Sequence, residues 1–227
     1  DGVIAVVFGV PAEVSQHLIA SPVIRAITFT GSIPVGKLLA AQAAAGMKRT
    51  TMELGGHAPV LVFDDVDVDA VLDLSVTSKF RNAGQVCVSP TRFYVQDAIY
   101  DRFAAGFAER AKKLPVGDPN SAQCALGPII NERQLERVDG IVKDAVAKGA
   151  VLRVGGTYDR LFYQPTVLED VKPGMRVLDE EVFGPVIAVV PFDTDEEAIA
   201  LSNGTEYGLS AGVITQSLER AMHFASR

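Results

Sequence analysis

The sequence has few of the residues that mark metal sites and disulfide frameworks. Among its 227 residues are only two cysteines and three histidines, and these are not grouped at the spacing of metal ligands. No apolar run approaches the ~20 residues that a membrane-spanning helix needs. Basic residues never cluster beyond pairs, and the formal net charge is −7. These absences argue against a metal centre, a disulfide scaffold, a membrane partner and a nucleic-acid partner.

The remaining composition is that of an ordinary globular protein. With 48% hydrophobic and 22% charged residues, the chain can form one large or two modest domains. Cys87 and Cys124 could pair, but nothing else suggests a disulfide, so we expect a reducing, cytoplasmic compartment. The chain begins at Asp1 without methionine and ends at Arg227 inside a helical pattern. We therefore expect a piece of a longer protein.

The order of the predicted elements indicates an α/β fold. Strands are predicted at 3–8, 24–30 and 47–53, separated by helices over 11–20 and 33–45. Strand, helix, strand, helix and strand in this order are typical of a doubly wound sheet. The first of these strands is a continuous apolar run, which predicts a strand covered on both faces.

Two consecutive glycines, Gly55 and Gly56, mark a predicted boundary between residues 1–56 and residues 57–227. The second part continues the alternation, with strands at 59–63, 93–95, 151–154, 163–168, 185–191 and 211–215, and helices at 68–82, 99–113, 131–149, 195–202 and 216–226. We expect Asp64 and Asp65 to cap the first of these helices.

Three polar motifs are predicted at the carboxyl ends of strands, where α/β proteins carry their chemistry. Phe29–Ser32 is a turn that opens a helix and offers free N–H groups to a phosphate. Glu53 ends an apolar strand and precedes a glycine pair, and Asp179–Pro185 places acids beside an apolar strand. Taken singly, each motif is better explained as a capping turn, a surface acid or a solvated loop.

A fourth stretch, Phe80–Arg92, contains Cys87 between a predicted helix and a predicted strand. A lone cysteine is more often a small buried hydrophobe than a nucleophile. Here Gly84 and a following Ser-Pro pair interrupt regular structure, and polar residues crowd the thiol. The pattern indicates a backbone bend that holds Cys87 at the mouth of a cleft. These polar neighbours are Arg81, Asn82 and Gln85.

Together these motifs resemble the NAD(P)-dependent aldehyde dehydrogenase superfamily. Phe-Thr-Gly-Ser at 29–32, Met-Glu-Leu-Gly-Gly at 52–56, Gly-Gln-x-Cys at 84–87 and Glu-Glu-x-Phe-Gly-Pro at 180–185 follow in family order. The stretch Ser78–Cys87 is most similar to the succinate-semialdehyde branch. The resemblance covers essentially the whole chain. It implies an α/β fold with part of a Rossmann-type cofactor domain at 1–56, then a catalytic domain at 57–227 that is truncated at its C-terminal end.

The resemblance also implies a catalytic chemistry. Cys87 would attack the aldehyde carbon and form a thiohemiacetal, which is oxidised to a thioester. Glu53 would act as the general base that activates water to hydrolyse this thioester. A coenzyme A-acylating member is less favoured, because that branch lacks the water-activating acid. The asparagine that shares the oxyanion with the Cys87 N–H in the family lies upstream of this chain.

The implied cofactor is NAD or NADP. Gly31 and Ser32 match the family's pyrophosphate-contacting turn, and Leu54 matches a backbone contact to the nicotinamide amide. Glu181 and Phe183 match residues that hold the nicotinamide ribose and ring. The residues that hold the adenosine ribose lie upstream, so we expect the isolated chain to be inactive.

The implied substrate is a small aldehyde, with succinate semialdehyde as the first candidate. Arg81 matches the arginine that holds the substrate carboxylate in that branch, whereas the ordinary alternative is a solvated arginine at a helix end. Another aldehyde, such as 2-oxoglutarate semialdehyde or an aliphatic one, remains an alternative, as does a non-catalytic domain piece. The full-length protein is expected to be a homodimer or homotetramer.

Overall fold

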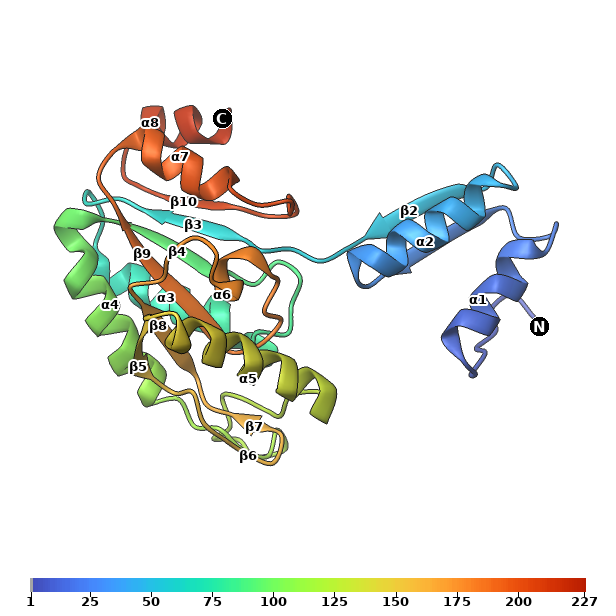
Figure 1. Cartoon of the computed structure of the whole chain (residues 1–227), viewed down its shortest axis with the longest axis horizontal. Helices are drawn as coiled ribbons and strands as arrows, with labels where there is room; N and C mark the ends of the chain where they lie inside the picture. Colours follow the sequence, from blue (N-terminus) through green and yellow to red (C-terminus); the bar gives the residue numbers. More distant parts are fainter. Residues whose placement is uncertain (1) are drawn as a thin grey trace. The chain divides into compact units, whose positions relative to one another are not determined.

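The computed structural model describes residues 2–227. The chain forms two compact units, Asp1–Gly55 and Gly56–Arg227. Figure 1 shows both units and labels most of the elements that are named below.

Unit 1 is a small α/β unit with two parallel strands. Its elements are α1 (Pro11–Ala20), β1 (Ala26–Thr30), α2 (Ile33–Ala44) and β2 (Arg49–Glu53). The strands pair in parallel so that Thr30 lies opposite Glu53. The Lys48 ammonium donates hydrogen bonds to the carbonyl oxygens of Ser21 and Ile24, at 2.7 and 2.6 Å, and so ties the β2 end of the sheet to the turn after α1.

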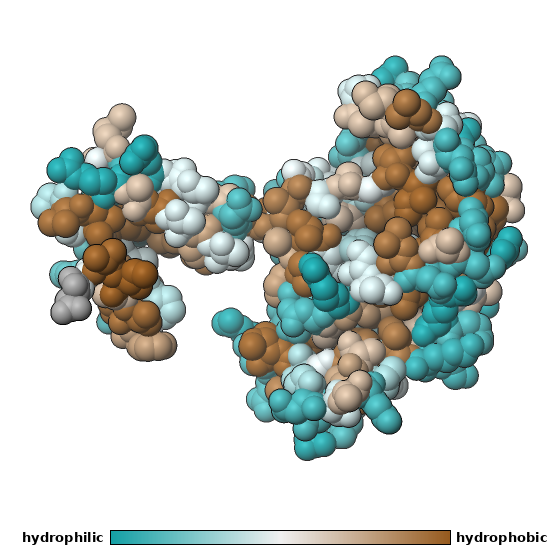
Figure 2. All heavy atoms as spheres, turned by 180° about the vertical axis from the view of Figure 1, so that it is seen from behind, coloured by the Kyte–Doolittle hydropathy of each residue, from teal (hydrophilic) through white to brown (hydrophobic). Residues whose placement is uncertain are grey.

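The strand predicted at 3–8 is wrong. The structure has no strand there, and Val3, Ile4 and Phe8 are 94%, 86% and 92% exposed. A strand covered on both faces needs neighbouring strands and helices. Among residues 2–55, the sheet contains only β1 and β2, so nothing pairs with the apolar segment. Figure 2 shows apolar side chains gathered on the surface of this unit.

Unit 2 is built on a mixed sheet of six strands in the order β10-β3-β4-β9-β8-β5. All neighbours are parallel except β5 and β8, which are antiparallel with a register shift between Leu152 and Val154. The strands are β3 (Pro59–Val62), β4 (Arg92–Gln96), β5 (Val151–Val154), β8 (Thr166–Glu169), β9 (Val186–Phe192) and β10 (Gly212–Ile214), and a small hairpin is formed by β6 (Tyr158–Asp159) and β7 (Phe162–Tyr163).

Helices cover both faces of this sheet (Figure 1). They are α3 (Val68–Phe80), α4 (Asp97–Lys112), α5 (Glu132–Ala147), α6 (Arg176–Asp179), α7 (Asp195–Asn203) and α8 (Leu218–Ala225). Alternation along β9 divides the core, because successive strand side chains point to opposite faces. Ile187 and Val189 pack in the cluster with α3 and α4, whereas Ala188 and Val190 pack in the cluster with α5 to α8.

The cap and the end of α3 differ from the prediction. Asp67, rather than Asp64 or Asp65, is the N-cap, and its carboxylate accepts from the N–H groups of Asp69 and Ala70. Asp65 instead accepts a hydrogen bond of 2.6 Å from the Thr215 hydroxyl. The helix ends at Phe80, short of the predicted residue 82, because the next turn leaves helical geometry.

Candidate active site

The bend before Cys87 is strained. After α3 the chain makes a 3₁₀ turn, Arg81–Gly84, in which Asn82 and Ala83 have φ of 52° and 54°. Gly84 follows with φ of 70°. Left-handed backbone costs a non-glycine residue roughly 1–2 kcal/mol. The bend reverses the chain, so that Cys87, a half-buried free thiol, lies in the loop just before β4.

Two glycines bring three distant segments into backbone contact at this bend. A Cβ atom built at Gly84 would overlap the Gly184 carbonyl, and one built at Gly56 would lie 2.5 Å from the Cys87 carbonyl oxygen. Only glycine allows backbones to approach this closely. The same Gly56 position is bordered by the Leu209 side chain. The Cys87 bend therefore lies against both the start of unit 2 and the loop before β9.

Glu181 lies at this junction. Its Oε1 accepts a hydrogen bond of 3.0 Å from the Gly56 N–H, and its own N–H donates to the Tyr207 hydroxyl at 3.4 Å. Burial raises the pKa of the Glu181 carboxyl, while the Gly56 N–H and the positive charge of Arg137 act in the opposite direction. The predicted ribose-binding carboxylate is thus anchored at the first residue of unit 2.

Phe183 has a left-handed backbone, with φ of 48°. A bulky residue in this region is an outlier that surrounding contacts must hold in place. Those contacts come from α5. The Gln134 amide donates to the carbonyl oxygens of Val182 and Phe183 at 3.1 and 3.0 Å, and the Arg137 guanidinium donates to the Glu181 carbonyl at 3.0 Å.

Arg81 is exposed at the same bend. Within residues 2–227, its side chain makes no hydrogen bond or ion pair, although most other arginines of unit 2 do. An exposed, unpaired guanidinium is available to an external anion.

The other predicted site residues lie in unit 1, at the carboxyl ends of β1 and β2. The Gly31 N–H donates to the Glu53 carbonyl at 3.0 Å, so the two strand ends are joined. Ser32 is the N-cap of α2, yet its hydroxyl makes no capping hydrogen bond. The Glu53 side chain is exposed, and the Leu54 side chain packs on Gly36 of α2. A free hydroxyl and the free N–H groups at the start of α2 fit an anionic phosphate.

Three basic residues of unit 2, which the sequence motifs did not indicate, are buried. Arg92, His57 and Lys79 are 1%, 2% and 0% exposed. Arg92 donates from Nε to the His57 carbonyl at 2.9 Å, and His57 Nε2 is 2.9 Å from the Leu178 carbonyl oxygen. Burial, reinforced by Arg92, lowers the pKa of His57 to about 3, and burial lowers the pKa of Lys79 to about 7. The apolar pattern of α3 could have indicated the burial of Lys79, because it places this residue on the buried face of the helix.

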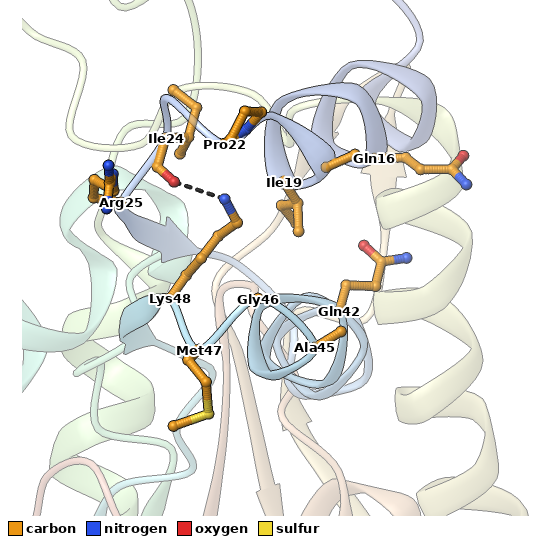
Figure 3. A pocket seen from close by; sticks show the side chains of 11 residues that line it. Gln16, Ile19, Pro22, Ile24, Arg25, Gln42, Ala45, Gly46, Met47 and Lys48 are labelled. Carbon is orange, nitrogen blue, oxygen red and sulfur yellow. Dashed lines mark hydrogen bonds between the residues drawn. The ribbon is translucent and has the colours of Figure 1, made fainter.

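Each unit contains a cavity. One of about 760 Å³ is formed in unit 1 at the C-terminal ends of α1 and α2, where Figure 3 shows Lys48 directed toward the Ile24 carbonyl. None of the predicted site residues lines it, since Ser32 is at the other end of α2. A second cavity of about 240 Å³ in unit 2 is lined by His57, Arg92 and the segment from Tyr207 to Ala211.

Three further findings concern residues 2–227 as a whole. No group of three His, Cys, Asp or Glu side chains is placed to hold a metal ion. No helix combines the length and apolar character that are needed to cross a membrane. Cys87 and Cys124 are both free thiols, and the Cys124 thiol donates to the carbonyl oxygens of Gly117 and Leu126 in its own loop.

The chain is similar to known proteins over nearly its whole length. The model of the aldehyde dehydrogenase family matches residues 1–227. A mitochondrial succinate-semialdehyde dehydrogenase of Arabidopsis thaliana is 45% identical over 97% of this chain and 42% of its own length. A 3-sulfolactaldehyde dehydrogenase of Pseudomonas putida is 42% identical over 97% of this chain and 46% of its own length.

Solved structures agree with the sequence relatives. The crystal structure of a succinate-semialdehyde dehydrogenase from Burkholderia pseudomallei superposes with a TM-score of 0.94 at 42% identity, over 97% of this chain and 46% of that one. The chain thus spans less than half the length of the relatives that it matches. The predicted α/β, aldehyde dehydrogenase-like fold is confirmed. The chain belongs to the aldehyde dehydrogenase family.

Proposed function

We propose that the full-length protein containing this chain oxidises an aldehyde with an acidic group, succinate semialdehyde first among them, to the corresponding acid. The observation that carries this proposal is the bend at Cys87, a free thiol, whose backbone approaches Gly56, the residue that Glu181 also contacts. The family membership supports oxidation of an aldehyde, because the relatives are named for aldehydes. It also supports NAD or NADP as the cofactor, because other relatives are named for NADP(+) or NAD(+).

The Cys87 thiolate would add to the aldehyde carbon and form a thiohemiacetal, whose oxyanion the Cys87 N–H can stabilise. NAD(P)⁺, when bound, supplies the hydride acceptor that converts this adduct to a thioester. Glu53 would then take a proton from water, and the resulting hydroxide would displace the thiolate and release the acid.

Residues of this chain fit one end of the cofactor. Gly31, Ser32 and the free N–H groups of α2 would hold the pyrophosphate, and the backbone of Leu54 would contact the nicotinamide amide. Glu181, anchored on Gly56, would hold the nicotinamide ribose, and Phe183 would lie against the ring. We assign residues 1–56 to the cofactor domain and residues 57–227 to the catalytic domain. The cofactor is NAD or NADP.

Arg81 would bind the acidic end of the substrate. Its guanidinium is exposed and free within the described chain, and bidentate pairing with a carboxylate is the strongest contact it can make. A sulfonate-bearing aldehyde is a second candidate, since one relative is named for 3-sulfolactaldehyde. The 2-oxoglutarate semialdehyde is a third, as it also carries a carboxylate.

The whole protein, rather than this chain alone, would be the active species. We propose a homodimer or homotetramer, supported by exposed apolar side chains such as Leu218 and Met222 of α8. We also propose a reducing compartment such as the cytoplasm, supported by the two free thiols.

Substitution in the full-length protein tests the proposal. We expect Cys87→Ala to abolish cofactor reduction with succinate semialdehyde, and retained activity would refute Cys87 as the nucleophile. We expect Arg81→Ala to raise KM for succinate semialdehyde by roughly 10- to 100-fold, because a charged hydrogen-bonded pair is lost. KM for an uncharged aldehyde should change less than about threefold. Arg133→Ala, an exposed arginine on α5, is the control.

A further inference from the structure

The side chain of Gln85 joins the Cys87 bend to the segment from Pro128 to Ile130. Its Oε1 accepts a hydrogen bond of 2.9 Å from the Ile130 N–H. Its Nε2 donates to the Pro128 carbonyl at 3.2 Å and to the Asn82 carbonyl at 3.3 Å. Every polar atom of the amide therefore has a partner, and exchange of its oxygen and nitrogen would oppose like groups at all three contacts.

The bend needs such a connection because its backbone is strained. Asn82 and Ala83 are left-handed, and relaxation would gain roughly 1–2 kcal/mol at each residue. Two hydrogen bonds, from the Gln85 N–H to the Asn82 carbonyl and from the Asn82 amide to the Gln85 carbonyl, are internal to the bend. They shape the turn but cannot fix where it lies. The Gln85 amide supplies the external attachment.

The segment that Gln85 contacts continues into α5, and α5 contacts the loop before β9. Asn131 is the N-cap of α5, and its side chain accepts from the Gln134 N–H at 3.0 Å. The Gln134 amide then donates to the carbonyl oxygens of Val182 and Phe183. Residues 128–134, which we call the bracket, therefore contact the Cys87 bend through Gln85 and the Phe183 loop through Gln134.

We propose that Gln85 is a positioning residue, which holds the strained bend and the bracket in register so that Cys87 faces the Glu181–Phe183 loop. The proposal rests on the proposed role of Cys87 as the nucleophile. Gln85 touches neither substrate nor cofactor in this role, and it acts through the bend that carries the thiol. The bracket is fixed independently at its start, where the Ile129 N–H donates to the Leu161 carbonyl at 2.8 Å.

Hydrogen exchange on the 227-residue chain tests the connection without any need for activity. Gln85→Met keeps the length of the side chain and removes its three hydrogen bonds. We expect exchange to accelerate at least tenfold both in peptides covering 82–87 and in peptides covering 128–131, while α4 is unchanged. Gln164→Met is the matched control, because Gln164 is also half-buried and its side-chain amide has no partner within residues 2–227.

Pre-steady-state kinetics on the full-length protein tests the consequence. We expect Gln85→Met to slow the burst of cofactor reduction about tenfold, with the Kd for NADH changed less than about twofold, because the Gln134 contacts remain. An unchanged burst, or faster exchange spread evenly over unit 2, would overturn the proposal. If Cys87→Ala retains activity, the proposed function fails instead, and the exchange result still decides whether Gln85 couples the two segments.

Discussion

The two units carry their predicted site residues at opposite ends of their parallel strands. In unit 1, Gly31 and Leu54 directly follow β1 and β2. They lie at the carboxyl ends of these strands, where α/β proteins usually carry their chemistry. In unit 2, Cys87 precedes β4 and Phe183 precedes β9, so both lie at the amino ends. The prediction that all the polar motifs lie at carboxyl ends is therefore wrong for the Asp179–Pro185 motif.

The difference follows from what holds each group. In unit 1 the polar groups depend on helix geometry, since Ser32 opens α2 and leaves its first N–H groups free. In unit 2, the Cys87 bend is followed by strand β4 and not by a helix. Close backbone approach at Gly56 and Gly84, and side-chain amides from the bend and from α5, hold the loops instead. A site of this second kind can be built at either end of a sheet.

Alanine at a glycine of each unit gives the largest expected contrast. At Gly84 the added methyl would meet the Gly184 backbone, and φ is 70°, so we expect Gly84→Ala to destabilise unit 2 by about 4 kcal/mol or more. At Gly36 the atoms nearest to the methyl belong to the flexible Leu54 side chain, and helix propensity favours alanine. Chemical denaturation should show Gly36→Ala within about 1 kcal/mol of the parent. Equal losses would contradict the contrast.

The proposed base and nucleophile give the next contrast, because Glu53 belongs to unit 1 and Cys87 to unit 2. In the full-length protein, Glu53→Gln should leave the first turnover nearly intact and lower the steady-state rate by about 100-fold or more, since general-base catalysis is lost only in hydrolysis. Cys87→Ser should remove both phases. Stopped-flow measurement of cofactor reduction separates the two, and loss of the burst in Glu53→Gln would refute its role as the hydrolytic base.

The same substitution at two lysines should have effects of opposite sign. Lys79 is fully buried without a partner in the described chain, whereas the Lys48 ammonium donates to two carbonyl oxygens. We expect Lys79→Met to stabilise unit 2 by roughly 1–2 kcal/mol at pH 7, and Lys48→Met to destabilise unit 1 by a similar amount. Destabilisation by Lys79→Met at pH 7 would refute this.

The effect of Lys79 also depends on pH. Its folded pKa is about 7, while the unfolded side chain titrates near 10.4. Between these values the unfolded chain binds a proton that the folded chain lacks, so stability rises as pH increases from about 7 to about 10.4. Below about pH 7 both states are protonated and the dependence on Lys79 ends. Lys79→Met should remove this slope in urea denaturation series.

Much of the fold could be predicted from the sequence, because apolar periodicity and turn residues are local signals. The helices α1, α2 and α4 and the strands β3 and β9 fall within a few residues of their expected positions. The structure of the segment 3–8 could not be predicted in this way, because a strand forms only where another strand pairs with it. The N-cap of α3 could have been Asp64, Asp65 or Asp67, and in the structure it is Asp67 that accepts from the first N–H groups of the helix.

The candidate site also has a part that the sequence indicated and a part that it did not. The motifs singled out Cys87, Glu181 and Phe183. In the structure, the segments that carry them approach one another at Gly56 and Gly84. The roles assigned to them remain predictions. The contacts of Gln85 and Gln134, and the burial of Lys79, depend on long-range packing that no local pattern of the sequence encodes.

The edges of the unit 2 sheet have a consequence for handling the protein. An exposed strand edge is a template for pairing with another chain, and short or irregular edges suppress this aggregation. At one edge β10 has only three residues, and at the other β5 carries the register shift between Leu152 and Val154. Among residues 2–55, by contrast, the apolar side chains of the segment 3–8 are exposed and no strand pairs with this segment. If the isolated chain precipitates during purification, self-association should therefore begin in its first ten residues.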